Sequence, residues 1–229
     1  MTGILSTYTP EATGSDPSDE KRLLSVDAWK ELVYLAHTEK SQAFDLYAKH
    51  YLSTNGQHYW SDTFQLSTYL DDYHKAIDAR APKHCQGTEV ISELYVPRHA
   101  LGEFLQKAAD CLRENRANVI YGTVRLIEKD SETFLPWAKD RWACTVMNLH
   151  VEHSASGIAN ARRCFRLLID LARSFGGSYY LTYHNFATGE QMLSCYPQMI
   201  EFIKLKQHYD PTERFASTWF DYCRQITSC

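Results

Sequence analysis

Six segments between residues 88 and 184 restrict the folds open to this 229-residue chain more than any other feature. Four of them place apolar residues at every second position, as a strand does, and two repeat them every three to four residues, as an amphipathic helix does. In order they are Glu89–Val96, Leu101–Leu112, Val119–Ile127, Trp142–Glu152, Ile158–Phe175 and Ser178–His184. This order predicts a split βαβ unit of the α+β class, a ferredoxin-like antiparallel sheet with both helices on one face.

Helical patterns flank the predicted sheet on both sides. Ser25 is a suitable N-cap for a first helix, and a second helix ends at the turn-forming pair Asn55-Gly56. Near the C-terminus a long helical pattern is kinked or restarted at Pro197, and a short aromatic tail follows it. The predicted organisation is a disordered leader over 1–22, a helical lead-in over 23–80, a linker over 80–84, the sheet domain over 85–184, and a helical segment over 185–229 that packs on it.

Composition and missing motifs exclude several classes of protein. A net charge of −4 and an isoelectric point near 6.2 argue against nucleic-acid binding, which needs a positive field. No apolar run is long enough to span a membrane, and the first residues do not resemble a signal peptide. Seven cysteines without a C-x-x-C pair indicate a reducing compartment, and we expect a cytoplasmic protein. His150 and His153, three apart on a strand, point to opposite faces, so no metal site is expected.

The sheet face opposite the helices is rich in residues that carry chemistry. Alternation along the four strands separates an apolar set, which suits burial under two helices, from a polar set. One reading of the polar set is a solvated outer face, and the other is a surface that covers a ligand. Carboxylates, tyrosines, histidines and an arginine, without lysine, favour the ligand. The polar set contains Glu93, Tyr95, Tyr121, Thr123, Arg125, Asn148, His150, Glu152 and His184.

Several strings in the sequence resemble one family of enzymes. They are Gly56–Gln57, Tyr59–Asp62, Gln65–Leu66, Gly122–Asp130, Gly176–His184, Ala187–Gln191, Cys195–Pro197, Phe202–Lys206 and Tyr209–Ser217. Together they resemble the C-terminal part of FAD-linked oxidases of the vanillyl-alcohol oxidase superfamily, which includes the aldonolactone and alditol oxidases. The resemblance covers roughly residues 20 to 225.

The resemblance implies a division of labour between two domains. In the family, an N-terminal domain holds FAD, and a C-terminal cap built on an antiparallel sheet closes over the flavin and forms the substrate pocket. The sequence has no glycine-rich loop of the kind that holds the FAD pyrophosphate. We therefore expect the chain to be the cap portion, to need an FAD-binding domain as partner, and not to hold FAD alone. A small-molecule substrate is implied, and self-association into a homo-oligomer through the polar face is plausible.

The family pattern also points to individual residues. Where it carries Glu-x-Arg on the second cap strand, this sequence has Thr123 and Arg125, so the arginine is kept and the carboxylate is not. The histidine of the third strand matches His150, and the late His-x-x-Lys begins at His184 but lacks its lysine. The resemblance thus implies His150 or His184 as base or orienting group and Arg125 as the balance for negative charge. Glu93 and Glu152 are the alternatives for supplying a carboxylate.

Two functions from different classes follow from these observations. The first is the substrate-binding portion of an FAD-dependent oxidoreductase that transfers hydride from a C–H bond to flavin, incomplete alone. The second is a binding or partner module that has the cap fold without its own catalytic activity.

Overall fold

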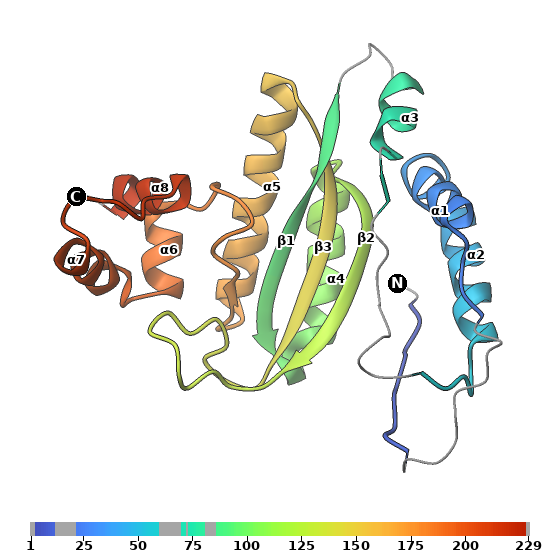
Figure 1. Cartoon of the computed structure of the whole chain (residues 1–229), viewed down its shortest axis with the longest axis horizontal. Coiled ribbons are helices and arrows are strands. Elements are labelled where there is room, and N and C mark those ends of the chain that lie inside the picture. The colour runs from blue at the N-terminus through green and yellow to red at the C-terminus, as the bar shows by residue number, and fades with distance from the viewer. Residues whose placement is uncertain (1–2, 12–21, 60–69, 72, 81–85, 228–229) are drawn as a thin grey trace. The chain divides into compact units, whose positions relative to one another are not determined.

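The computed structural model describes residues 3–11, 22–59, 70–71, 73–80 and 86–227. It divides the chain into two compact units, Met1–Cys85 and Gln86–Cys229 (Figure 1). Most of the predicted leader, the linker residues 81–84 and most of the aromatic strings between residues 59 and 66 lie outside the described residues.

The first unit is helical, as the sequence predicts. It contains α1 (Val26–Thr38), α2 (Lys40–Ser53) and α3 (Tyr73–Arg80), and α1 packs against both of the others. The Ser25 hydroxyl accepts a hydrogen bond from the Ala28 amide at 3.2 Å, which confirms the expected N-cap. Gly56 follows α2 with a φ of +76°, a left-handed conformation that glycine adopts without strain.

The second unit is built on a four-stranded antiparallel sheet. Its strands are β1 (Gly87–Pro97), β2 (Asn118–Ile127), β3 (Trp142–Glu152) and β4 (Ser178–Tyr179), in the spatial order β2-β3-β1-β4. All three strand pairs are antiparallel, and only the pairing of β2 with β3 contains a register shift, a bulge at Ile120. The predicted α+β class and antiparallel sheet are confirmed.

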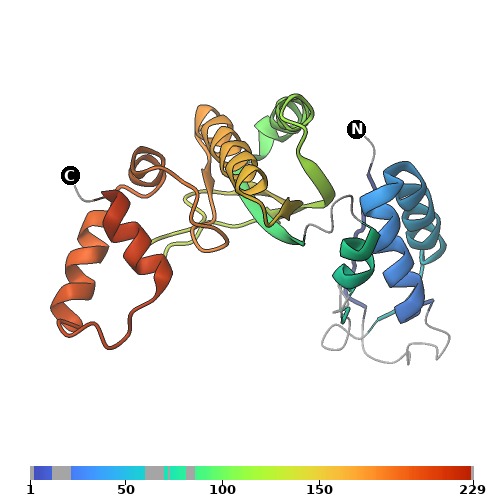
Figure 2. The ribbon, with the colours of Figure 1, turned by 90° about the horizontal axis from the view of Figure 1, so that it is seen from above.

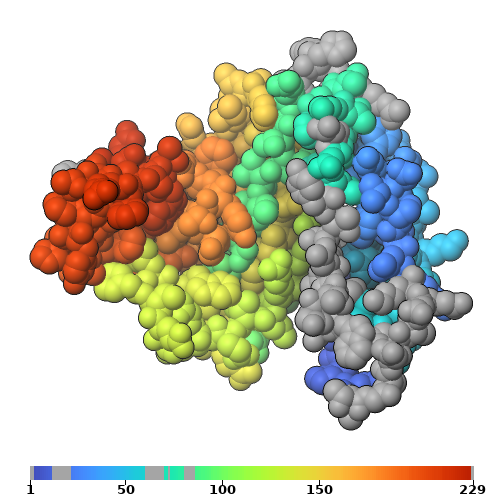
Figure 3. All heavy atoms as spheres, in the orientation of Figure 1, coloured from blue at the N-terminus to red at the C-terminus, as the bar shows by residue number. Residues whose placement is uncertain are grey.

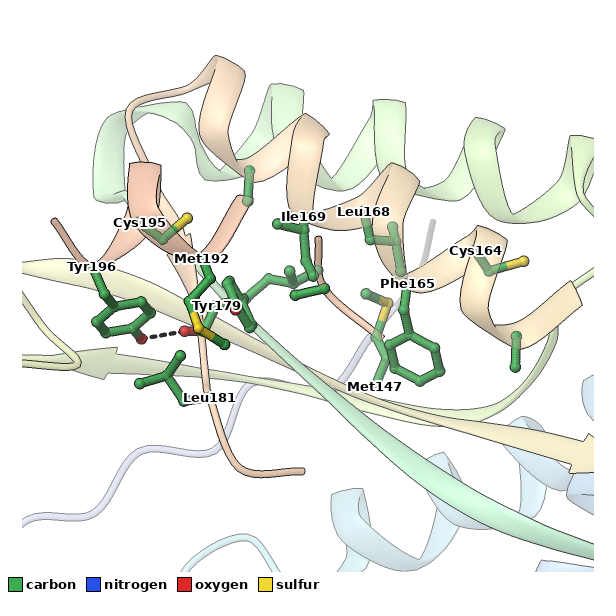
Figure 4. Packing of buried hydrophobic residues seen from close by; sticks show 14 of the residues in the cluster. Met147, Cys164, Phe165, Leu168, Ile169, Tyr179, Leu181, Met192, Cys195 and Tyr196 are labelled. Carbon is green, nitrogen blue, oxygen red and sulfur yellow. Dashed lines mark hydrogen bonds between the residues drawn. The ribbon is translucent and has the colours of Figure 1, made fainter. Parts of the chain in front are cut away.

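Two long helices cover one face of this sheet. The short turn η2 (Arg98–Ala100) leads from β1 into α4 (Leu101–Glu114), and α5 (Ala155–Ser174) follows β3. Both helices lie on the same side of the strands (Figure 2). Ser154 caps α5 by accepting from the Gly157 amide at 3.0 Å. The core between helices and strands buries most of the apolar set, as Figure 4 shows for Phe165, Leu168 and Ile169 of α5 beside Met147 of β3.

Three shorter helices close the unit: α6 (Gly189–Cys195), α7 (Met199–Tyr209) and α8 (Thr218–Thr227). The predicted interruption of the helix at Pro197 is confirmed, because Pro197 lies between the end of α6 at Cys195 and the start of α7 at Met199. Thr188 and Gln191 form a capping box at the start of α6. The short aromatic tail expected after residue 211 contains a helix instead, since α8 forms there and buries Phe220 and Cys223.

The predicted length of the fourth strand is wrong, because β4 ends at Tyr179, five residues before its predicted end at His184. The Tyr180 amide still donates to the Glu93 carbonyl at 2.9 Å, but the chain then turns at Leu181 and Thr182. Side chains from the C-terminal segment donate hydrogen bonds to the backbone carbonyls of this stretch. Trp219 Nε1 donates to the Leu181 carbonyl at 2.9 Å, and the Tyr196 hydroxyl donates to that of Tyr179 (Figure 4). These tertiary hydrogen bonds replace the ladder that alternation alone predicts.

Two glycines are expected to respond to alanine with opposite signs. Gly102 lies in α4 with no atom within 4 Å of the position that a Cβ would take, so Gly102→Ala is expected to stabilise the chain by about 0.5–1 kcal/mol. Gly176 has the same free space but a φ of +74°, so Gly176→Ala is expected to cost about 1–2 kcal/mol. Urea unfolding of the two variants measures both changes, and equal signs would contradict the backbone description.

Candidate functional site

The strand register places most of the predicted polar set on one surface. We call this surface the outer face, meaning the face of the sheet opposite α4 and α5. Leu94 and Val96 belong to the core under the helices, whereas Tyr95, Cys144 and Val146 form a separate buried cluster on the other side. The outer face carries Glu93, Tyr95, Tyr121, Thr123, Arg125, Asn148, His150 and Glu152, as their register positions show.

The same register separates these residues along the strands. Arg125 lies opposite Cys144, which lies opposite Tyr95, so the three form one row across the sheet. His150 lies in another row, opposite Glu89. Six residues separate Cys144 from His150 on β3, which at about 3.3 Å per residue is roughly 20 Å. Arg125 and His150 therefore share a face, as predicted, but lie too far apart along it to contact one small ligand together.

Glu93 is the centre of a group of polar side chains at the Arg125 end. It is 8% exposed, and the Tyr95 hydroxyl donates to its Oε1 at 2.5 Å. Burial first, and then the nearby Glu93 carboxylate, raises the pKa of the Cys144 thiol and of the Tyr183 hydroxyl, which places both groups near this carboxylate. We call Glu93, Tyr95, Arg125, Cys144 and Tyr183 the Glu93 cluster. Sequence analysis missed Cys144, which alternation places on this face, and it missed Tyr183, which follows the turn after β4.

The charges within the Glu93 cluster shift the pKa values of its members. Burial and then the Glu93 carboxylate raise the pKa of the Tyr95 hydroxyl, the Cys144 thiol and the Tyr183 hydroxyl, so all three remain protonated donors. Arg125 lies opposite Cys144 in the sheet, and its positive charge opposes this shift at Cys144 and at Tyr183. Arg125 is exposed and makes no ion pair with any residue that the structure describes. Its guanidinium is thus available to a ligand beside a buried carboxylate.

His150 belongs to a different arrangement at the far end of the outer face. Its Nδ1 lies 3.1 Å from Oε1 of Glu89, and both side chains are largely buried. A carboxylate at this distance orients the imidazole ring, as in many acid–base pairs. Glu152 lies near this end too, opposite Gly87, and is exposed.

His184 does not lie on the outer face, and this corrects the sequence prediction. Because the chain turns after Tyr180, His184 packs among aromatic rings on the helix side of the sheet. Its ring centroid is 4.3 Å from that of Phe165 and 5.3 Å from that of Phe186. It is 9% exposed, its Nδ1 has no hydrogen-bond partner among the described residues, and burial lowers its pKa to about 4. His184 is a neutral core residue.

The fold is an α+β domain, and the Glu93 cluster gives one face of its antiparallel sheet a group of polar side chains. Residues 47–223 match the family model for D-arabinono-1,4-lactone oxidase, so the chain belongs to this family of FAD-linked oxidoreductases. No curated protein matches the sequence. Enzymes of the family act on small molecules and use FAD. Within the described part of the chain, no helix is long and apolar enough to cross a membrane.

The described residues do not fit the diphosphate of FAD. Such a group is usually held by free backbone amides of a glycine-rich loop at a helix N-terminus. Here Ser25, Ser154 and Thr188 occupy the N-termini of α1, α5 and α6 as side-chain caps. The N-termini of α2, α4 and α7 have no side-chain cap, but no glycine-rich loop leads into any of these three helices. Gly56 and Gly176, the described glycines with positive φ, follow helix C-termini, where the helix dipole repels an anion.

Proposed function

We propose that this chain supplies the substrate-binding portion of an FAD-dependent aldonolactone oxidoreductase, and that the substrate binds at the Glu93 cluster. The dinucleotide is held by an FAD-binding domain. The observation that carries the proposal is a buried carboxylate, Glu93, with an exposed arginine, Arg125, in the next row of the same sheet face. Sugar lactones present hydroxyl donors and carbonyl acceptors side by side, which is the complement of this pair of groups.

Glu93 is suited to accept a proton or hydrogen bond from a substrate hydroxyl. A carboxylate offers about four acceptor positions. The Tyr95 hydroxyl takes up one of them in the structure, which leaves others for a ligand. This hydrogen bond fixes one carboxylate oxygen in place, as suits a general base. Arg125 donates to substrate oxygen atoms and balances negative charge that develops on them.

The position of Glu93 also explains a departure from the family pattern. That pattern has a glutamate where this chain has Thr123. Thr123 pairs with Val146, which pairs with Glu93, so the two residues occupy the same row of the outer face. A carboxylate two strands away thus takes the place of the missing one. Glu152 is the weaker alternative because it lies six residues beyond Val146 on β3, roughly 20 Å along the strand.

Calorimetric titration with D-arabinono-1,4-lactone tests the proposal. The unmodified chain is expected to bind the lactone, and Glu93→Gln and Arg125→Ala are each expected to weaken binding about tenfold or more, because each removes a charge-assisted hydrogen bond. Glu103→Gln and Arg113→Ala are matched controls, since both residues are exposed on α4. Equal affinity of the two cluster variants and the two control variants would refute the assignment of the site.

A further inference from the structure

The second unit contains a pocket that the proposed function does not use. It has a volume of about 380 Å³, within the usual range of ligand pockets of about 300–1,000 Å³. Its walls come from the loop between β2 and β3, from the turn after β4 and from α7 and α8. Figure 3 shows this yellow-green loop next to the red C-terminal helices. Six aromatic side chains line it: Phe134, Trp137, Tyr180, Tyr196, Phe202 and Trp219.

The chemistry of the lining selects one kind of occupant. None of the lining residues is charged. The Tyr196 hydroxyl and the Trp219 Nε1–H already donate to backbone carbonyls, and the remaining hydroxyls come from Thr133, Thr182 and Tyr180. A second sugar ring needs many hydrogen-bond partners, which such walls do not provide. A neutral aromatic ring needs only apolar and aromatic contact, which they do.

The pocket adjoins the Glu93 cluster through two pairs of rings. Trp137 lines the pocket and meets the ring of Tyr95 edge to face, with centroids 5.9 Å apart. Tyr180 also lines it, and its ring centroid lies 4.8 Å from that of Tyr183. The Tyr95 hydroxyl donates to Glu93, and the Glu93 carboxylate contributes, after burial, to the raised pKa of Tyr183. The pocket and the Glu93 cluster therefore meet at these two pairs of rings.

We infer that the substrate of this chain is a hydroxyl-rich group joined to a neutral aromatic ring, and that the ring occupies the pocket. This inference rests on the proposed function, because it assumes that the hydroxyl-rich end binds at the Glu93 cluster. Two probes with the same sugar separate the contribution of the ring: phenyl β-D-glucopyranoside and methyl β-D-glucopyranoside. D-arabinono-1,4-lactone reports on the polar end alone.

The experiment is a titration of the full chain followed by NMR of the indole N–H groups. Phenyl glucoside is expected to bind about tenfold or more tightly than methyl glucoside and to shift the indole signals of Trp137 and Trp219. Thr182 is exposed at the pocket rim, so Thr182→Trp fills the pocket and is expected to abolish the difference, whereas Thr182→Ser is the matched control that retains it. Thr182→Phe replaces the tryptophan variant if circular dichroism shows that the latter misfolds.

The outcomes distinguish the inference from the proposed function. Equal affinity for the two glucosides, or an advantage of the phenyl ring that survives Thr182→Trp, overturns the inference. If the lactone still binds in that case and Glu93→Gln weakens it, the proposed function stands. If the phenyl glucoside shifts both indole signals while the lactone does not bind, the pocket is a ring-binding site and the proposed function fails. Binding of neither glucoside overturns the inference.

Discussion

Phe165→Ala is expected to lower the free energy of unfolding by about 3–5 kcal/mol, the largest loss of stability that we expect from a single truncation. Phe165 is completely buried in α5 and contacts the rings of His184 and Phe186, with centroids 4.3 and 5.4 Å away. Removing its ring leaves a cavity that these neighbours, held by the turn after β4, cannot fill. Small domains are stable by only about 5–15 kcal/mol, so the variant should be close to unfolding.

Urea unfolding followed by circular dichroism measures this loss. Leu167→Ala is the matched control, because Leu167 lies two residues away on the same helix and is 39% exposed. Its truncation is expected to cost well under half as much. A loss for Phe165→Ala no greater than that for Leu167→Ala would show that the packing of α5 on the sheet is described wrongly.

The second large effect is an acid-induced loss of stability that depends on His184. Burial lowers the pKa of His184 from 6.5 to about 4, so between these values the unfolded chain binds a proton that the folded chain does not. Acid therefore favours unfolding in this window. The contribution of His184 is complete above about pH 6.5 and decreases as the pH falls toward 4. At 1.36 kcal/mol for each pKa unit, the loss is about 3 kcal/mol.

Urea unfolding between pH 7.5 and pH 4.5 tests this dependence. His184→Leu removes the titrating group from an apolar site and is expected to flatten the decrease in stability with acid. His208→Gln is the control, since His208 is exposed on α7, and it should retain the full decrease. An unchanged pH dependence in His184→Leu would mean that His184 is accessible to solvent, as the sequence-based placement on the outer face requires.

The elements of the sheet and their order along the chain could be predicted, because each element has its own local periodicity. Trp142–Glu152 has the predicted bounds, and β1 and β2 extend their predicted ranges by one or two residues. The alternating pattern gave a wrong prediction where tertiary hydrogen bonds to the backbone replace the hydrogen bonds between neighbouring strands. The residues after Tyr179 alternate like a strand, but Trp219 and Tyr196, from distant parts of the sequence, bind the carbonyls of Leu181 and Tyr179.

The site could be predicted in part for a similar reason. Alternation assigns Glu93 and Arg125 to the outer face correctly, but a face says nothing of distance along a strand. The hairpin formed by β2 and β3 already contains this information, because antiparallel pairing sets Arg125 opposite Cys144 and His150 near the start of β2. The spacing of Phe220, Cys223 and Thr227 likewise indicates a buried helical face that the sequence prediction overlooked. The aromatic pocket was beyond prediction, since its walls come from three separate segments.

Residue-resolved NMR of the chain during titration with D-arabinono-1,4-lactone tests the central claim most directly. We expect saturable shifts of the amides of Glu93, Tyr95, Arg125 and Cys144, and no comparable shifts at Glu89 and His150, roughly 20 Å away along the sheet. Shifts centred on Glu89 and His150 would contradict the claim, because they would place the substrate at the other end of the outer face. Absence of any shift at saturating lactone would contradict it as well, and would favour a partner module with the cap fold.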